Sequence, residues 1–234
     1  MADNEIGQDR PETPIDALGI MASQQAILGP NLRQIEMYTR RGLLSLLWHE
    51  PDTAEQKVGV VMVGGAMGGT LGPGDSLFHA LGEALSSVGV PSIRLSYRKP
   101  NDMDSCCVDT AAAVQLLVGS GADAVVIMGH SFGGAVAIRV AVGLSEMVCG
   151  VVTFATQSAG CEIAGGLQSR PLLMFHGDSD SILPLEASEV VRAIAGTGDL
   201  HVMHGDDHLL VKSHDVMFST TMDWLNTVFA GVAS

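Results

Sequence analysis

Short apolar runs alternate along this chain with longer segments in which apolar residues recur every three or four positions. The short runs are rich in valine and isoleucine and predict buried strands, whereas the longer period predicts helices that pack by one face. We predict strands over residues 58–63, 91–97, 122–129, 150–155, 170–177 and 199–205. We predict helices over residues 75–89, capped by Asp75, then 103–120, 131–144 and 185–195, and a last one that ends near Ala233.

Strands and helices in this order predict an α/β fold: a mostly parallel central sheet of about eight strands, flanked by helices. The segments 33–40 and 42–50 precede this pattern and predict a hairpin that turns at Arg41 and Gly42. Residues 1–31 fall outside the pattern and are predicted to be an N-terminal extension, where 15–28 fit a short amphipathic helix. Residues 32–234 are predicted to form the main domain.

The composition fits a folded protein, since 47% of the 234 residues are hydrophobic and only 16% are charged. The net charge is −14, and an acidic surface repels nucleic-acid phosphates and anionic lipids. No apolar run reaches the ~20 residues that span a bilayer, and the acidic start is unlike a secretory signal. We therefore expect a cytoplasmic protein with neither nucleic acid nor membrane as partner. The four cysteines lack zinc-binding spacing and are expected to be reduced thiols.

The segment GHSFG, residues 129–133, lies where a predicted strand gives way to a predicted helix. This is the G-x-S-x-G pattern of a nucleophile elbow, in which a tight turn points the serine oxygen away from the sheet. Gly129 and Gly133 lack a Cβ, so that strand and helix approach closely. The helix directs its amino end, which is partly positive, toward the serine. We therefore predict that Ser131 is a nucleophile.

A serine hydroxyl is a weak nucleophile and needs a base, which in turn needs an acid to orient it. The strand 170–177 is followed by two candidate acids, and we favour Asp180, in the pattern GDSDSILP, over Asp178, which we expect to shape the turn. The strand 199–205 is followed by His208, the predicted base.

The other histidines fit the role of a base less well. His201 and His204 fall within the last predicted strand, where an imidazole more often packs or forms a hydrogen bond. His176 ends its strand, and His214 begins the last helix. His130, next to the serine, is expected to pack under the elbow or to line a pocket.

Attack on an acyl carbonyl places negative charge on its oxygen, which requires an oxyanion hole. One predicted donor is the amide of Phe132, the residue after the nucleophile. The other is the amide of Ala66, or of its neighbours Gly65 or Met67, in the glycine-rich loop 64–69. A phosphate-binding loop is the alternative, but neither the G-x-G-x-x-G spacing nor a following Gly-Lys-Ser/Thr is present.

Residues 32–234 resemble the α/β-hydrolase superfamily, through GHSFG, GDSDSILP, GDDH, the glycine-rich loop and the order serine, aspartate, histidine. Within it the chain is most similar to the dienelactone-hydrolase-like and small serine esterase group, on GGAMGGT and FHALGEALSSVGVPSIRLSYR. Two residues depart from that group. Ser131 stands where dienelactone hydrolases proper have cysteine, and Gly64-Gly65 stands where many relatives have His-Gly.

The resemblance also implies that a substantial lid is absent. Relatives with a cap insert dozens of residues after the strand 150–155, whereas only TQSAGCEIAGGLQS, residues 156–169, lies before the next strand here. We expect an open, shallow pocket lined by Gly65, Met67, Leu71, His130, Cys161, Ile182, Leu183 and Leu209. Arg98 and Lys99 either attract a substrate carboxylate or form ion pairs with Asp102 or Asp104.

The sequence thus predicts a serine hydrolase that cleaves carboxylic esters with small or short acyl groups through an acyl-enzyme, without metal or other cofactor. Alternatives are a thioesterase, lactonase, amidase or acyltransferase with the same three residues, or a ligand-binding protein without catalysis. The expected partner is a small-molecule ester, and a homodimer is possible.

Overall fold

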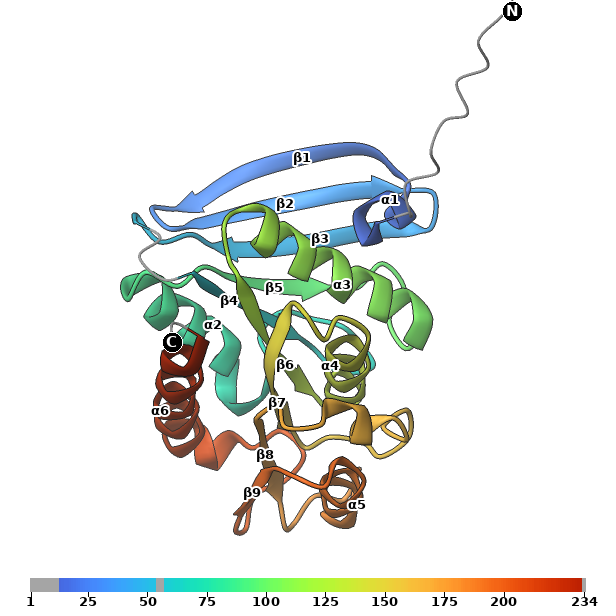
Figure 1. Ribbon diagram of the computed structural model, residues 1–234, viewed down its shortest axis with the longest axis vertical. Helices are drawn as coiled ribbons and strands as arrows, with labels where there is room; N and C mark the ends of the chain where they lie inside the picture. The colour runs from blue at the N-terminus through green and yellow to red at the C-terminus, as the bar shows by residue number, and fades with distance from the viewer. Residues whose placement is uncertain (1–12, 54–56, 233–234) are drawn as a thin grey trace, which may run out of the picture.

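A computed structural model describes residues 13–53 and 57–232, and in this part a nine-stranded sheet runs through the molecule (Figure 1). Its spatial order is β1-β2-β3-β5-β4-β6-β7-β8-β9. Pairing is antiparallel from β1 to β5 and parallel from β5 to β9, which confirms the mostly parallel sheet. The strands are β1 (Ile20–Gly29), β2 (Leu32–Thr39), β3 (Gly42–His49), β4 (Val58–Val63), β5 (Ser92–Ser96), β6 (Ala124–His130), β7 (Val148–Phe154), β8 (Leu172–Gly177) and β9 (Asp199–Met203).

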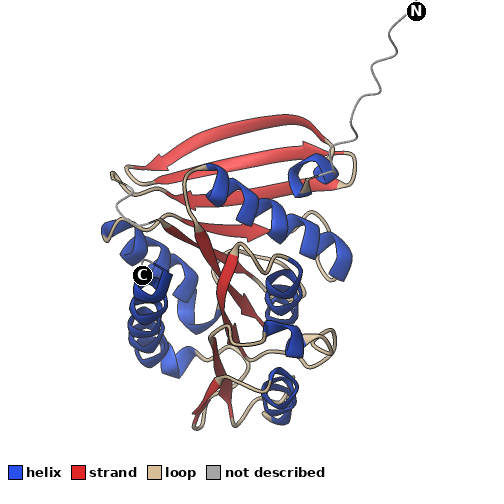
Figure 2. Ribbon diagram, in the orientation of Figure 1, coloured by secondary structure: helices blue, strands red, loops and turns tan. Residues whose placement is uncertain are grey.

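Helices cover both faces of this sheet (Figure 2). On one face α2 (Pro73–Ser87) packs against α6 (His214–Val232). The other face carries α1 (Pro14–Leu18), α3 (Met103–Gly119), α4 (Phe132–Gly143) and α5 (Glu186–Ala195). Because both faces are covered, β4, β6 and β8 are buried at every position, which explains why their sequences are apolar apart from His130 in β6 and His176 in β8. Between β7 and β8 the chain forms only a loop with one short 3-10 helix, η1 (Ala164–Leu167), and no lid.

The N-terminal region differs from the helix expected over residues 15–28. Only Pro14–Leu18 is helical, and Gly19 ends the helix in the left-handed conformation with φ of 61°. The following residues form β1, which pairs along β2 from Ile20 to Gly29. This strand is the ninth of the sheet, one more than expected. Its sequence is compatible with either form, and the free edge of β2 decides between them because it offers backbone partners along its length.

The start of α2 also differs from expectation, because Asp75 does not cap it. The element begins at Pro73, after Gly72, and residues 74–76 have positive φ values that kink its first turn. The kink ties this turn to the chain after β9, since the Gly74 amide donates to the carbonyl oxygen of Leu209 at 2.7 Å. Long-range contact has here overridden the local capping signal.

All four cysteines are free thiols, as expected from their spacing. Burial raises the pKa of Cys106 and of Cys161 to about 12, which makes both poor nucleophiles. Across 13–53 and 57–232, no helix combines the length and the apolar character that crossing a bilayer requires.

Candidate active site

Ser131 occupies the sharp turn between β6 and α4. Its φ of 56° and ψ of −120° lie far from the usual regions for a residue with a side chain. The turn is held by two backbone hydrogen bonds, from the Ser131 amide to the Phe154 oxygen at 2.8 Å and from the Gly134 amide to the Ser131 oxygen at 3.0 Å. Ser131 is partly exposed, whereas its neighbours on both sides are buried. The strained turn therefore presents a serine to solvent at the carboxyl edge of the sheet.

The two glycines of the elbow are required by close backbone contacts. A Cβ on Gly129 would lie 2.0 Å from the Gly133 oxygen, and a Cβ on Gly133 would lie 2.3 Å from the Gly64 oxygen. The strand side and the helix side of the elbow therefore pack closely against each other, and the helix side also packs against the glycine-rich loop after β4.

Asp180 and His208 meet through a hydrogen bond of 2.7 Å between Oδ2 and Nδ1. The Asp180 carboxylate is fully buried, and the His208 side chain is only 10% exposed. A carboxylate on Nδ1 fixes the proton there and leaves Nε2 free to accept another. The two residues arise from loops after adjacent strands, β8 and β9, which is why 28 positions of sequence separate neighbours in space.

The loop after β8 keeps Asp180 ionised. Burial raises the pKa of Asp180, but hydrogen bonds from the Leu183 amide, from His208 and from the Ile182 amide together bring it below its ordinary value. The two amides donate to Oδ1 at 2.9 and 2.8 Å, which leaves Oδ2 for the imidazole. Asp180 is therefore an anion held in one orientation.

Asp178 has a different role. Its Oδ1 accepts from the Gly205 amide at 2.7 Å and its Oδ2 lies 2.8 Å from Nδ1 of His204. These contacts join the turns after β8 and β9, as expected for a residue that shapes the turn. His204 lies just beyond β9 and is exposed, rather than within the strand as predicted. His201 does lie in β9, where its ring packs on Phe175.

Two further histidines support these groups. His130 is buried, and its Nε2 donates to the main-chain oxygen of His208 at 3.0 Å. Burial lowers the pKa of His130 to about 4, so that its ring is neutral near pH 7. His176, also buried, donates from Nε2 to the Leu183 oxygen at 3.0 Å and lies 3.3 Å from Oδ2 of Asp180. Sequence analysis assigned no role to His176, although its place two residues before Asp178 was a usable signal.

The loop after β4 lies against the nucleophile. A Cβ on Gly65 would stand 3.5 Å from the Cβ of Ser131. The loop is closed by a hydrogen bond from the Gly68 amide to the Gly65 oxygen at 2.9 Å. No described residue accepts a hydrogen bond from the amide of Ala66 or of Phe132, the first residue of α4. Both amides therefore lack an acceptor among the described residues.

Comparison with known sequences gives no match, either among protein-family models or among curated proteins. Solved structures do match. Est1E from Butyrivibrio proteoclasticus has a TM-score of 0.71 at 15% identity, over 84% of this chain and 99% of that one. XC6422 from Xanthomonas campestris, an α/β serine hydrolase without lid, has a TM-score of 0.65 at 17% identity, over 85% and 97%. Dienelactone hydrolase from Anabaena variabilis has a TM-score of 0.69 at 14% identity, over 84% and 98%.

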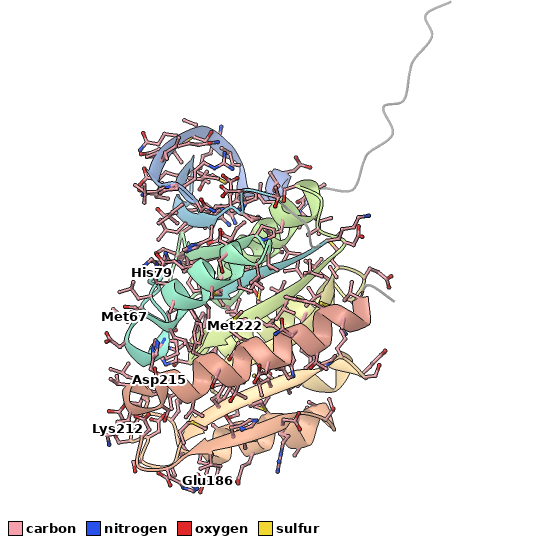
Figure 3. The ribbon with its side chains drawn as sticks, turned by 90° about the vertical axis from the view of Figure 1, so that its left-hand side faces the viewer. Met67, His79, Glu186, Lys212, Asp215 and Met222 are labelled. Carbon is pink, nitrogen blue, oxygen red and sulfur yellow. The ribbon has the colours of Figure 1, made fainter. Side chains whose placement is uncertain are left out.

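The chain has the α/β-hydrolase fold. In this fold, loops after the parallel strands carry the site, and here the loops after β4, β6, β8 and β9 converge. Figure 3 shows Met67, after β4, and Lys212, after β9, at the same edge of the molecule.

The expected pocket residues divide into three groups. Met67, Leu71, Ile182 and Leu209 are exposed, with Met67 reaching 92%. Gly65 and Leu183 are partly buried and belong to the loops described above. Cys161 was predicted wrongly as a pocket residue, because its side chain is wholly enclosed and faces the core beside α4. His130 is buried and contacts His208, which leaves both of its predicted placements open.

The cations after β5 form ion pairs rather than a free anion site. Arg98 is buried and its Nε lies 2.5 Å from Oδ1 of Asp109, which is not one of the two partners expected. Lys99 pairs with Asp102 at 2.8 Å, as expected. Both cations border a cavity of about 1100 Å³ between α1, the β2–β3 turn and α3, none of whose lining residues belongs to the site above.

Proposed function

We propose that the chain is a serine hydrolase that cleaves carboxylic esters with small or short acyl groups. The observation that carries this proposal is the buried Asp180–His208 hydrogen bond at the edge where the strained Ser131 and two unpaired amides lie. The strained backbone conformation at Ser131 costs free energy. A binding protein without catalysis has no need of an imidazole that a carboxylate orients.

In the proposed mechanism His208 accepts the proton of Ser131 through Nε2 while the serine oxygen attacks the acyl carbon. Amides of Phe132 and Ala66 donate to the oxygen as it becomes negative. Asp180 stabilises the imidazolium, which then protonates the leaving alcohol and leaves an acyl-enzyme. Water then attacks the acyl carbon as His208 takes its proton, the bond from that carbon to the Ser131 oxygen breaks, His208 returns the proton to this oxygen, and the acid departs. Each step uses only side chains and amides of this chain.

The preference for small acyl groups rests on the shape of the site. Without a lid, the exposed side chains of Met67, Leu71, Ile182 and Leu209 supply the apolar surface proposed to contact an acyl chain. Structures that share the fold support the reaction class, since they include esterases and a lidless serine hydrolase, and one shows Est1E with ferulic acid bound.

The test is hydrolysis of p-nitrophenyl esters from acetate to dodecanoate by the wild type and by Ser131→Ala. We expect a maximum at short chains and a loss of at least about 10³-fold in the variant. Ser179→Ala is the matched control, because Ser179 contacts only Asp178 among the described side chains. Absence of Ser131-dependent turnover would contradict ester hydrolysis, and the corresponding thioesters, lactones and amides assayed in parallel would then show which acyl group the site accepts.

A further inference from the structure

Arg94 in β5 is a buried arginine without a described carboxylate at ion-pair distance, although the charge of Glu83, on the far side of His79, acts on it. Its residue is 2% exposed, and it forms no ion pair with a described carboxylate. Its guanidinium donates instead to three neutral acceptors: Nε to Nε2 of His49 at 3.0 Å, Nη1 to the Thr70 oxygen at 3.0 Å and Nη2 to Nδ1 of His79 at 3.3 Å. Burying a charge without an opposite charge in direct contact is costly, so a role for Arg94 at this position is to be sought.

His49 and His79 both accept hydrogen bonds from the Arg94 guanidinium. A guanidinium only donates, so the ring nitrogens that face it carry no proton. The proton of His79 is then on Nε2, which lies 3.3 Å from the Glu83 carboxylate. Burial, together with the charge of Arg94, lowers the pKa of His49 to about 4 and keeps it neutral. A rigid network thus surrounds Arg94 and ends on Thr70.

Thr70 is the far end of the loop that lies against Ser131. That loop contains glycine at positions 64, 65, 68 and 69, and glycine adopts more backbone conformations than other residues, so contacts beyond the loop's own Gly68–Gly65 hydrogen bond help to fix it. Its near end is held by Tyr97, whose hydroxyl donates to the Gly64 oxygen at 3.3 Å. Its far end is held by Arg94, which lies on the face of the sheet opposite to that of Tyr97. This face is the one covered by α2, where Figure 3 shows His79.

We propose that Arg94 is a positioning residue of the oxyanion hole. By fixing the Thr70 carbonyl it holds the Ala66 amide at the place where the acyl oxygen becomes negative. This inference rests on the proposed serine hydrolase mechanism. An oxyanion donor acts only within hydrogen-bond distance of that oxygen, so a small displacement of the loop weakens the transition state more than the bound substrate.

The test compares Arg94→Met and Arg94→Lys with the wild type. We expect Arg94→Met to lower kcat by about 10- to 100-fold with KM changed less than about threefold, and Arg94→Lys to recover part of the loss. The inhibition constant of a trifluoromethyl ketone, which forms an oxyanion on Ser131, should rise by the same factor as kcat/KM falls. A purely structural role would lower the titre of active sites instead.

Arg170→Met is the matched control. Arg170 also binds backbone oxygens, those of Ala141, Gly166 and Leu167, but it precedes β8 at the opposite edge of the sheet. Arg170→Met should change the melting temperature without changing kcat or the inhibition constant of the trifluoromethyl ketone.

Fluorophosphonate labelling of Ser131 separates the two proposals. If the wild type is not labelled, the serine hydrolase mechanism is wrong. If the wild type is labelled and folded Arg94→Met is labelled at the same rate, the role of Arg94 is wrong. Should Arg94→Met not fold, Arg94→Lys and Gly82→Ala replace it, since a Cβ on Gly82 would stand 2.5 Å from Nε2 of His49 and displace an acceptor of Arg94. If Arg94→Lys and Gly82→Ala are both labelled at the wild-type rate, the inference is also overturned.

Discussion

The Nε2 of His130 donates a hydrogen bond to the main-chain oxygen of His208, 3.0 Å away, and the two rings lie with their centroids 5.0 Å apart. The residue before the proposed nucleophile therefore holds the residue proposed as its base. This contact joins the end of β6 to the loop after β9, 78 positions away in the sequence, and β7 and β8 lie between these two strands in the sheet. It gives the elbow a direct influence on the position of the imidazole.

His130→Phe keeps a ring at this place but removes the donor. We expect kcat to fall by about three- to tenfold, because a hydrogen bond of this kind contributes about 1 kcal/mol. KM and the rate of unfolding are measured with it. His201→Phe is the control, since His201 lies in β9 and packs on Phe175. An unchanged kcat in folded His130→Phe would show that the contact does not position the base.

The two acids after β8 should respond very differently to loss of charge. Asp180→Asn leaves the geometry but favours the wrong tautomer of His208, and we expect kcat to fall by about 10³- to 10⁴-fold. Asp178→Asn alters a partly exposed contact with His204 and should change kcat by less than about threefold. Steady-state kinetics on one short ester compares them. Equal losses would mean that the carboxylates do not have separate roles.

The free energy of unfolding should decrease in weak acid because of two buried histidines. His49 and His130 have pKa values near 4 in the fold and about 6.5 when unfolded, so the unfolded chain binds more protons between these values. Stability is complete above about pH 6.5 and decreases as the pH falls toward 4. Each histidine contributes at most about 3 kcal/mol to this decrease. Asp180, whose pKa is below its ordinary value, loses its contribution only at lower pH still.

Urea unfolding at pH 7.5, 5.5 and 4.5 measures this dependence. His49→Gln offers Arg94 an amide oxygen that does not titrate, and it should flatten the curve. A wild-type stability that does not change across this range would contradict the assignment of neutral, buried rings.

Two glycines of α4 should differ sharply in their tolerance of alanine. Gly133→Ala would place a Cβ 2.3 Å from the Gly64 oxygen, and we expect it to prevent folding or to abolish activity. Gly143→Ala meets nothing within 4 Å and should stabilise the helix by about 0.5–1 kcal/mol. Circular dichroism and thermal melting compare the two variants. Normal activity in Gly133→Ala would mean that the elbow and the glycine-rich loop are less tightly packed than described.

Much of the fold could be predicted from the sequence because its signals are local. The buried strands β4 and β6 are apolar runs, apart from His130 at the end of β6, with glycine directly after or near their ends, and such runs have few alternatives in an α/β pattern. β1 could not be predicted, since Ile20–Gly29 is uncharged, exposed along nearly all its length and lacks a clear period. Its conformation depends on pairing with β2, and a local sequence pattern does not contain this information.

The site shows the same division. Ser131, Asp180 and His208 each stand just after a strand, so that their order along the chain sufficed to bring them together as candidates. Arg94 lies inside a strand, and its importance appears only through contacts with residues 24 and 45 positions away. Cys161 shows the opposite error, because proximity in sequence to an open loop did not make it accessible.

β9 pairs only with β8 among the described strands, yet the loop that follows it carries His208. An edge strand opens locally at a lower free energy than the centre of a sheet. Moderate denaturant should therefore detach the imidazole while β4 and β6 still hold the elbow in place. Catalysis would then cease before the chain unfolds, and it would return on dilution without refolding of the central strands. A denaturant titration followed by activity would report the opening of β9, whereas one followed by a spectroscopic signal would report global unfolding.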